Sequence, residues 1–111
     1  MTSLCNWQQL TPEAPEYEFA GGEKVVMAKE SLAPGGVGAL HRHDRTEEFI
    51  LVVEGQVTMT IGEGELTLGP GDAVVIAPKT VHGLHTDGGA TLYATFAPSE
   101  GRIPIDDYHP V

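Results

Sequence analysis

Residues 35–55 read GGVGALHRHDRTEEFILVVEG, a stretch in which two histidines are separated by a single residue. In an extended strand, side chains two positions apart point to the same face, and their Cα atoms lie roughly 6.5–7 Å apart. His41 and His43 are therefore expected to project side by side, so that their imidazoles can converge on one metal ion. This spacing predicts a metal site on one face of a strand.

An acidic pair follows the two histidines after the short polar segment 44–46, which reads Asp-Arg-Thr. A turn at this segment would let the next strand begin beside the first. A carboxylate at the start of the new strand could then reach the same ion. Because Glu47 and Glu48 face opposite sides of an extended strand, we expect only one of them to be a ligand.

A second histidine cluster, His82-Gly83-Leu84-His85, lies about forty residues further along the chain. His82 is expected to supply a fourth ligand from a later strand. Its offset of three positions from His85 places the two side chains on opposite faces of a regular strand. A bulge, which Gly83 would permit, would change that arrangement.

Three imidazoles and one carboxylate, without a thiolate, form a donor set of borderline hardness. Such a set suits a divalent transition metal, namely Fe, Mn, Ni, Co, Zn or Cu, and the residue types do not select one of them. Octahedral coordination would leave two positions open for water, dioxygen or a bidentate substrate. An open position distinguishes a working metal site from a structural one.

The rest of the chain reads as short strands separated by turns. Its 14 glycines and 8 prolines recur throughout and leave no clean stretch for a long helix. The apolar segments between them are rich in residues that favour strands. The expected strands are residues 24–32, 39–43, 48–54, 56–61, 65–68, 73–76, 81–85 and 91–97. About eight strands with regular turn signals predict an all-β fold, either an antiparallel sandwich or a small barrel.

Length and composition limit what the protein can be. A chain of 111 residues, 41% of them hydrophobic, supports one domain over residues 1–111. We expect a core at about 24–97, an N-terminal arm at 1–22 and a C-terminal tail at 99–111. The strand segment 49–53 is apolar on both faces, so its outer face needs a cover from a second sheet, the arm or a second subunit.

Charge and cysteine content exclude several classes of partner. The formal net charge is −10, which argues against binding to nucleic acid or an acidic membrane, because phosphate binding needs clustered lysine and arginine. The sequence contains no run of about 18 apolar residues, so no membrane span is predicted. A single cysteine, Cys5, cannot form an internal disulfide, and the first residues lack the features of a secretory signal. We therefore expect a cytoplasmic protein.

The histidine-rich stretch resembles the first motif of the cupin family, Gly-x5-His-x-His-x3,4-Glu-x6-Gly. Gly35, His41, His43, Glu48 and Gly55 occupy every defined position of that motif. The other glutamate of the acidic pair would break the distance to Gly55. The resemblance therefore favours Glu48 as the acidic ligand.

The second cupin motif, Gly-x5-Pro-x-Gly-x2-His-x3-Asn, is matched more loosely. Gly71 and His82 agree with its first glycine and its histidine. Ala77 stands in the proline position, Lys79 replaces the second glycine, and Thr86 replaces the asparagine. These departures concern the loop before His82 more than His82 itself.

The resemblance covers about residues 24–97 and implies a small single-domain cupin, a double-stranded β-helix or jelly-roll barrel. It implies a metal held by His41, His43, Glu48 and His82. It also implies a homodimer, which would cover the outer face of segment 49–53.

Two classes of function remain open. The first is a metal-dependent enzyme, a dioxygenase or an isomerase or lyase, that activates a small organic substrate by Lewis-acid catalysis. His85 and Glu47 are the candidate proton-transfer residues for it. The segment Thr95-Phe96-Ala97-Pro98 after the barrel is similar to small cupins that open unsaturated uronate rings. The second class is a non-catalytic cupin that binds or senses a sugar or another small molecule.

Overall fold

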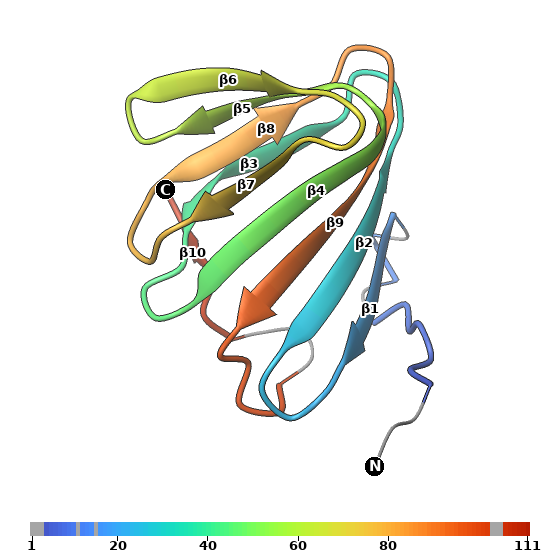
Figure 1. Ribbon diagram of the computed structural model, residues 1–111, viewed down its shortest axis with the longest axis vertical. Helices are drawn as coiled ribbons and strands as arrows, with labels where there is room; N and C mark the ends of the chain where they lie inside the picture. The colour runs from blue at the N-terminus through green and yellow to red at the C-terminus, as the bar shows by residue number, and fades with distance from the viewer. Residues whose placement is uncertain (1–3, 11, 15, 103–105) are drawn as a thin grey trace.

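The computed structural model describes residues 4–10, 12–14, 16–102 and 106–111, which form ten strands and no helix (Figure 1). The strands are β1 (Tyr17–Gly21), β2 (Val26–Leu32), β3 (Val37–Arg42), β4 (Glu47–Gly55), β5 (Val57–Ile61), β6 (Gly64–Leu68), β7 (Ala73–Ile76), β8 (His82–His85), β9 (Ala90–Ala97) and β10 (His109–Pro110).

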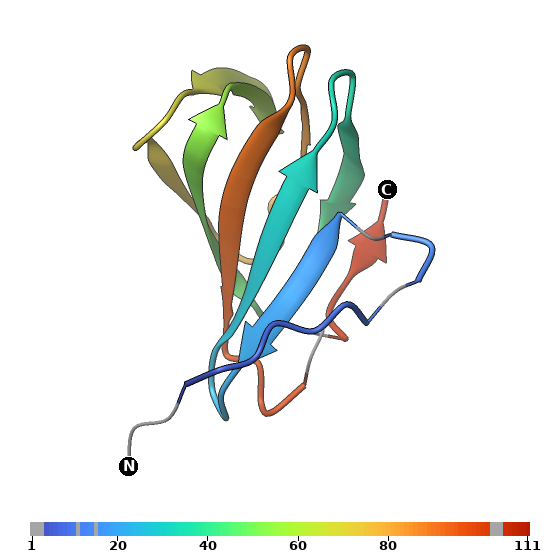
Figure 2. The same ribbon diagram turned by 90° about the vertical axis from the view of Figure 1, so that its right-hand side faces the viewer.

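Two five-stranded sheets enclose the interior, in the orders β1-β2-β9-β4-β7 and β10-β3-β8-β5-β6. Every neighbouring pair in both sheets is antiparallel. Apart from the hairpins β1–β2 and β5–β6, successive strands lie in different sheets, and Figure 2 shows one such passage, from β2 into β3. The prediction of an all-β jelly-roll barrel is confirmed.

The core lies between the sheets and follows the alternation of each strand. On β4, Glu48, Ile50 and Val52 are buried, whereas Phe49 and Leu51 between them are exposed. This alternation is what a half-buried strand requires, because successive side chains point to opposite faces. The buried apolar cluster comprises Ala28, Ile50, Val52, Val57, Met59, Leu68, Ile76, Ala90, Leu92 and Ala94.

The last residue of β4 explains why the first motif ends in glycine. Gly55 has φ +76°, and a Cβ atom at this position would lie 2.1 Å from the carbonyl oxygen of Gly89. Any side chain would therefore collide with backbone as well as adopt a strained conformation. A glycine here allows β4 to end against the loop between β8 and β9.

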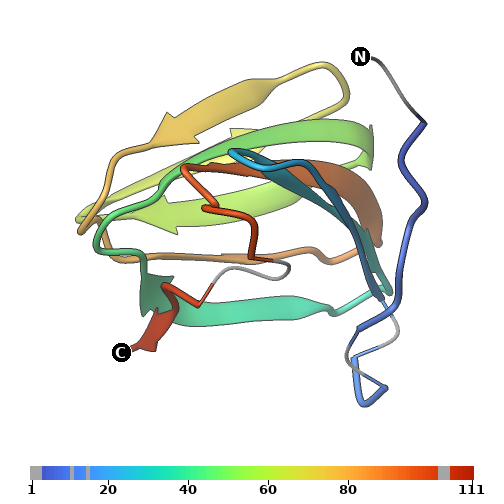
Figure 3. The same cartoon turned by 90° about the horizontal axis from the view of Figure 1, so that it is seen from below.

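Both segments expected to be arms contain a strand. Within the expected N-terminal arm, β1 pairs with β2 along its whole length. Within the expected C-terminal tail, β10 pairs with β3 through His109 and Pro110, and Figure 3 shows it lying against the edge of β3. Both are edge strands, and the two-residue β10 is too short for an alternating pattern, so neither was expected from the sequence.

No helix among the described residues is long and apolar enough to cross a membrane.

Candidate metal centre

Four side chains from separate parts of the fold meet inside the barrel. His41 lies on β3, His43 directly follows β3, Glu48 lies on β4 and His82 begins β8. One potential ligand atom from each of the four lies within 4.8 Å of those of the other three. His43, Glu48 and His82 are buried, and His41 is half-buried. The structure therefore brings together the four residues predicted as ligands.

The backbone fixes the orientation of all three imidazoles. Nδ1 of His41 donates to the carbonyl of Ala39 over 2.8 Å, and Nδ1 of His82 donates to the carbonyl of Thr80 over 2.9 Å. Nδ1 of His43 donates to the carbonyl of Asp107 over 2.6 Å. Because a carbonyl oxygen only accepts hydrogen bonds, each neutral ring carries its proton on Nδ1 and keeps a lone pair on Nε2. Metal-bound histidines have this same arrangement.

The Nε2 atoms of His43 and His82 converge on one carboxylate oxygen. Oε1 of Glu48 lies 3.1 Å from Nε2 of His43 and 2.9 Å from Nε2 of His82. Oε1 and the two Nε2 atoms each carry a lone pair, so at these distances they repel one another unless a proton or a metal ion lies between them. Two ligand atoms each about 2.1 Å from an ion and at right angles to it lie about 3.0 Å apart. The donor set and its spacing therefore fit a divalent transition metal.

The acid and bases of the cluster shift one another's pKa values. Burial alone would raise the pKa of Glu48, but the hydrogen bonds that His43 and His82 donate from Nε2 when their rings are protonated outweigh burial and lower it. Burial alone would lower the pKa of His43, but its contacts with Glu48 and Asp107 raise it. Burial lowers the pKa of His41, which has no such direct contact with Glu48. The cluster thus keeps a carboxylate ionised beside imidazoles.

Asp107 holds the turn between the histidine pair and Glu48. Its carboxylate accepts hydrogen bonds from the backbone N–H groups of Asp44, Arg45 and Thr46, at 3.0, 2.7 and 3.0 Å, and from the Thr46 hydroxyl. Burial opposes ionisation, but these donors lower the pKa of Asp107 well below its ordinary range. The same residue thus orients His43 through its carbonyl and shapes the turn leading to Glu48 through its side chain.

Two aromatic rings flank the histidines. Tyr108 stacks on His41 with ring centroids 4.5 Å apart, and Phe96 meets His43 edge-on at 5.3 Å. Tyr108 is itself half exposed, so it covers the solvent side of the half-buried His41. No role is predicted for Asp107 or Tyr108 from the sequence, because both follow the barrel strands and lie more than sixty positions from the cluster and turn residues that they contact.

Glu47 and His85, the predicted proton-transfer residues, do not join the cluster. Glu47 is exposed on the outer face of β4, next to the buried Glu48. His85 is exposed at the end of β8, on the face opposite to His82. The side chains of Glu47 and Glu48 lie on opposite faces of β4, and those of His82 and His85 on opposite faces of β8, as predicted. Gly83 forms no bulge that would turn His85 inward.

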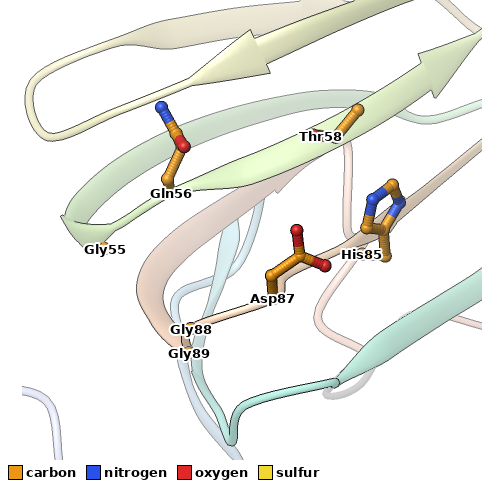
Figure 4. Close-up of a pocket in the computed structure, with 7 residues that line it drawn as sticks. All are labelled: Gly55, Gln56, Thr58, His85, Asp87, Gly88 and Gly89. Atoms are coloured by element: carbon orange, nitrogen blue, oxygen red, sulfur yellow. The ribbon is translucent and has the colours of Figure 1, made fainter.

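His85 instead lines a shallow pocket of about 300 Å³ at the other end of β4 (Figure 4). The lining consists of Gly55, Gln56, Thr58, His85, Asp87, Gly88 and Gly89. Its lining residue Gly55 lies at the opposite end of β4 from Glu48, and His85 lies three positions after His82 on β8, roughly 10 Å along that strand. The pocket is distinct from the four-residue cluster.

Several known proteins are similar to this chain. An uncharacterised protein of Methanocaldococcus jannaschii is 31% identical over 71 residues, which cover 64% of this chain and 57% of that protein. The pectin degradation protein KdgF of Dickeya dadantii is 25% identical over 93 residues, which cover 83% of this chain and 84% of that protein. The chain therefore spans little more than half the length of the first of these relatives.

The fold is also found in solved structures. The structure of KdgF from Halomonas sp. superimposes with a TM-score of 0.71 at 25% identity, covering 84% of this chain and 87% of that chain. The family model of the cupin domain matches residues 28–110, which include all four clustered residues and both aromatic rings beside them. The chain belongs to the cupin family.

Proposed function

We propose that this cupin binds a divalent transition metal through His41, His43, Glu48 and His82 and acts on a small organic substrate there. The observation that carries the proposal is the set of three Nδ1–carbonyl hydrogen bonds, which turn the Nε2 atoms toward Glu48. A chain that used these histidines only for packing would have no need to fix three tautomers around one carboxylate.

A divalent ion in this cluster would supply Lewis acidity, which stabilises negative charge developing on a substrate oxygen. The chain itself supplies the shape and polarity of the surroundings. Phe96 closes the side of His43, and Tyr108 forms an aromatic surface beside His41. His41 is the half-buried member of the cluster and Tyr108 covers its solvent side, so a substrate that approaches from there would contact Tyr108.

The relatives favour isomerase or lyase chemistry over a dioxygenase reaction. One relative is named for pectin degradation, and the Halomonas structure carries the same protein name. We therefore propose an oxygen-rich, sugar-derived substrate of the kind that arises when an acidic polysaccharide is broken down. Unsaturated uronates are the first compounds to assay.

The second candidate function is a binding or sensing cupin without turnover. It is supported by the position of Glu47 and His85, which lie outside the cluster and leave it without the proton-transfer groups expected from the sequence. A protein of this kind would bind the sugar-derived ligand at the metal and release it unchanged.

We further propose a homodimer formed through the outer face of the β1-β2-β9-β4-β7 sheet. Phe49 on β4 and Val75 on β7 are paired across the sheet, and each is 52% exposed. Leu51 and Val53 extend the same apolar face. A second copy would cover this face, and Phe49→Glu should convert a dimer to a monomer in light scattering; an unchanged mass would refute this interface.

The lone cysteine and the charge of −10 support a reducing, cytoplasmic location without a nucleic-acid partner. Fractionation of cells that express the chain at native levels would test this location.

The proposed metal centre is tested by comparing neighbouring glutamates. Glu48→Ala should lower the metal content of anaerobically purified protein severely, whereas Glu47→Ala should leave it at one ion per chain. Elemental analysis measures both. Equal metal content in the two variants would contradict the assignment, and turnover of an unsaturated uronate by the Glu47→Ala protein would separate enzyme from binding module.

A further inference from the structure

Tyr108 is an aromatic residue placed at the edge of the candidate metal centre. Its ring stacks on that of His41, with centroids 4.5 Å apart and an angle of 24° between the ring planes. Its centroid lies 6.2 Å from that of His43. Because His109 pairs with Arg42, the same register continued by one residue puts Tyr108 opposite His43. Tyr108 therefore lies on the face of the sheet that carries the ligand histidines.

Core packing does not account for this ring. Phe96, the other aromatic neighbour of His43, packs against the buried apolar cluster and therefore has a structural role. Tyr108, by comparison, is 49% exposed, so about half of its surface is free for contact. An aromatic ring held half in solvent beside a metal-binding cluster offers a large apolar surface to a bound molecule.

The chain is fixed on both sides of Tyr108. On one side, the carbonyl of Asp107 accepts a hydrogen bond from His43, and its carboxylate accepts hydrogen bonds from the backbone of the turn 44–46. On the other side, β10 pairs with β3. A ring that is already in place loses little conformational freedom when it meets a ligand, so the contact contributes more fully to affinity.

We propose that Tyr108 is a specificity-determining residue, whose exposed ring surface contacts the flat, unsaturated part of a small molecule bound at the four-residue cluster. This role rests on the proposed function, since it needs a ligand at the metal centre. It deepens that function by naming the feature that the site selects, a planar ring or double-bond system next to the oxygen atoms that reach the metal.

The chemistry of the ring determines which ligands it favours. An aromatic ring attracts other flat π systems, with ring centroids about 4.5–7 Å apart. The imidazole of His41 occupies part of the Tyr108 ring, and the exposed remainder faces solvent. A ligand held through its oxygens and extending past His41 toward solvent would place its carbon skeleton against Tyr108. A short, acyclic ligand would make much less of this contact.

The first experiment compares two ligands that carry the same metal-binding group. Acetohydroxamate and benzohydroxamate are titrated separately into the Co²⁺-loaded protein, and visible absorption gives the dissociation constant of each. The two differ in a methyl or a phenyl group, so the ratio of their affinities reports the contact made by the phenyl ring. We expect the wild type to prefer benzohydroxamate by about tenfold.

Substitutions test whether this preference comes from Tyr108. Tyr108→Phe keeps the ring and should keep the preference, whereas Tyr108→Leu should reduce it to about a third or less. Tyr93→Leu is the matched control, because Tyr93 is half-buried on the outer face of β9, where it contacts Trp7. The control should leave the preference unchanged. A preference of equal size in the wild type and in Tyr108→Leu would overturn the proposal.

The ratio of affinities also separates ligand contact from structural support. If Tyr108 served only to hold His41, Tyr108→Leu would weaken the binding of both hydroxamates by the same factor, and their ratio would not change. Loss of the preference in a variant that still binds one Co²⁺ per chain is the result that supports contact with the ligand.

The second experiment uses the wild-type protein and does not depend on the folding of Tyr108→Leu. Benzohydroxamate is bound to the Zn²⁺-loaded protein, and nuclear Overhauser cross-peaks between its phenyl protons and the ring protons of Tyr108 are measured. Tyr108→Phe identifies the tyrosine signals. We expect these cross-peaks, and their absence from a ligand shown to be bound would overturn the proposal.

Failure of the metal centre and failure of the Tyr108 contact give different results. If the wild type takes up no Co²⁺, the proposed metal centre is wrong, and the role of Tyr108 falls with it. If the wild type and Tyr108→Leu both bind one Co²⁺ per chain and show the same preference between the two hydroxamates, the metal centre stands and the role of Tyr108 falls.

Discussion

The two ends of the barrel both carry histidine, but only one of them holds it in a buried cluster that could bind a metal ion. At the cluster end, His82 is 1% exposed, and its Nδ1 is held by a backbone carbonyl. At the other end of the same four-residue strand, His85 is exposed beside a shallow pocket and makes no hydrogen bond among the described residues. The comparison shows that burial and a fixed tautomer, rather than residue type, distinguish a candidate ligand from an ordinary surface histidine.

The largest expected effect tests this difference directly. His82→Ala should abolish stoichiometric metal binding, because it removes a buried imidazole that the backbone holds in the orientation a ligand needs. His85→Ala, the matched change on the same strand, should leave metal content unchanged. Inductively coupled plasma mass spectrometry of both proteins decides the matter, and loss of metal from the His85→Ala protein would break the comparison.

A large effect on stability is expected at Asp107, which ties the cluster end together. Asp107→Ala leaves three backbone N–H groups of the turn without their acceptor and should cost about 3 kcal/mol of unfolding free energy. It should also weaken metal binding roughly 10- to 100-fold, because the turn before Glu48 loses its acceptor and is no longer tied to the segment whose carbonyl orients His43. Denaturant titration and metal competition measure the two effects.

Asp106 provides the control for this change. Its side chain is 57% exposed and makes only surface ion pairs with Arg45 and Arg102. Asp106→Ala should therefore change stability by less than about 1 kcal/mol. Equal losses in the two variants would mean that the turn is not held by Asp107.

The stability of the protein at acid pH gives a second test of the contribution of Asp107. Since its folded-state pKa lies below the ordinary value of 3.8, the stability that it contributes is complete above that value and is lost as pH falls toward the folded-state pKa. Asp107→Asn should be less stable than the wild type at pH 6 and show a shallower loss of stability below pH 4. Parallel acid titrations of the two proteins would contradict this linkage.

A smaller effect is expected at the opposite end of the barrel. Thr86 is buried, donates its hydroxyl to the carbonyl of Gln56 over 2.7 Å and accepts from the N–H of Gly89 over 3.1 Å. Thr86→Val should cost about 1–2 kcal/mol of stability. Metal content should not change, and a change would show that the two ends are coupled.

Strand periodicity explains why so much of the cluster could be predicted from the sequence. The positions of His41, His43 and Glu48 depend on alternation and on one short turn, and both are local properties. The strands of the barrel were predicted with boundaries that differ by a few residues, because turn residues mark them. The family resemblance was needed to choose Glu48 over Glu47. His82 was expected as a fourth ligand from the second histidine cluster, but its place beside β3 is set by the topology of the whole barrel and could not be derived locally.

The remaining features depend on contacts between distant segments. Asp107 contacts the turn 44–46 across the end of the barrel, and no local sequence pattern predicts that contact. Strand β10 contains only two residues, one of them proline, which is too short for a strand pattern.

The carbonyl that orients His43 is contributed by a residue 64 positions later. During synthesis, domains are built from the N-terminus, so the histidine pair and Glu48 leave the ribosome long before Asp107 does. The barrel strands can associate in that interval, but the imidazole of His43 lacks its acceptor until the segment that carries Asp107 docks. The candidate metal centre can therefore be completed only after that segment has been synthesised.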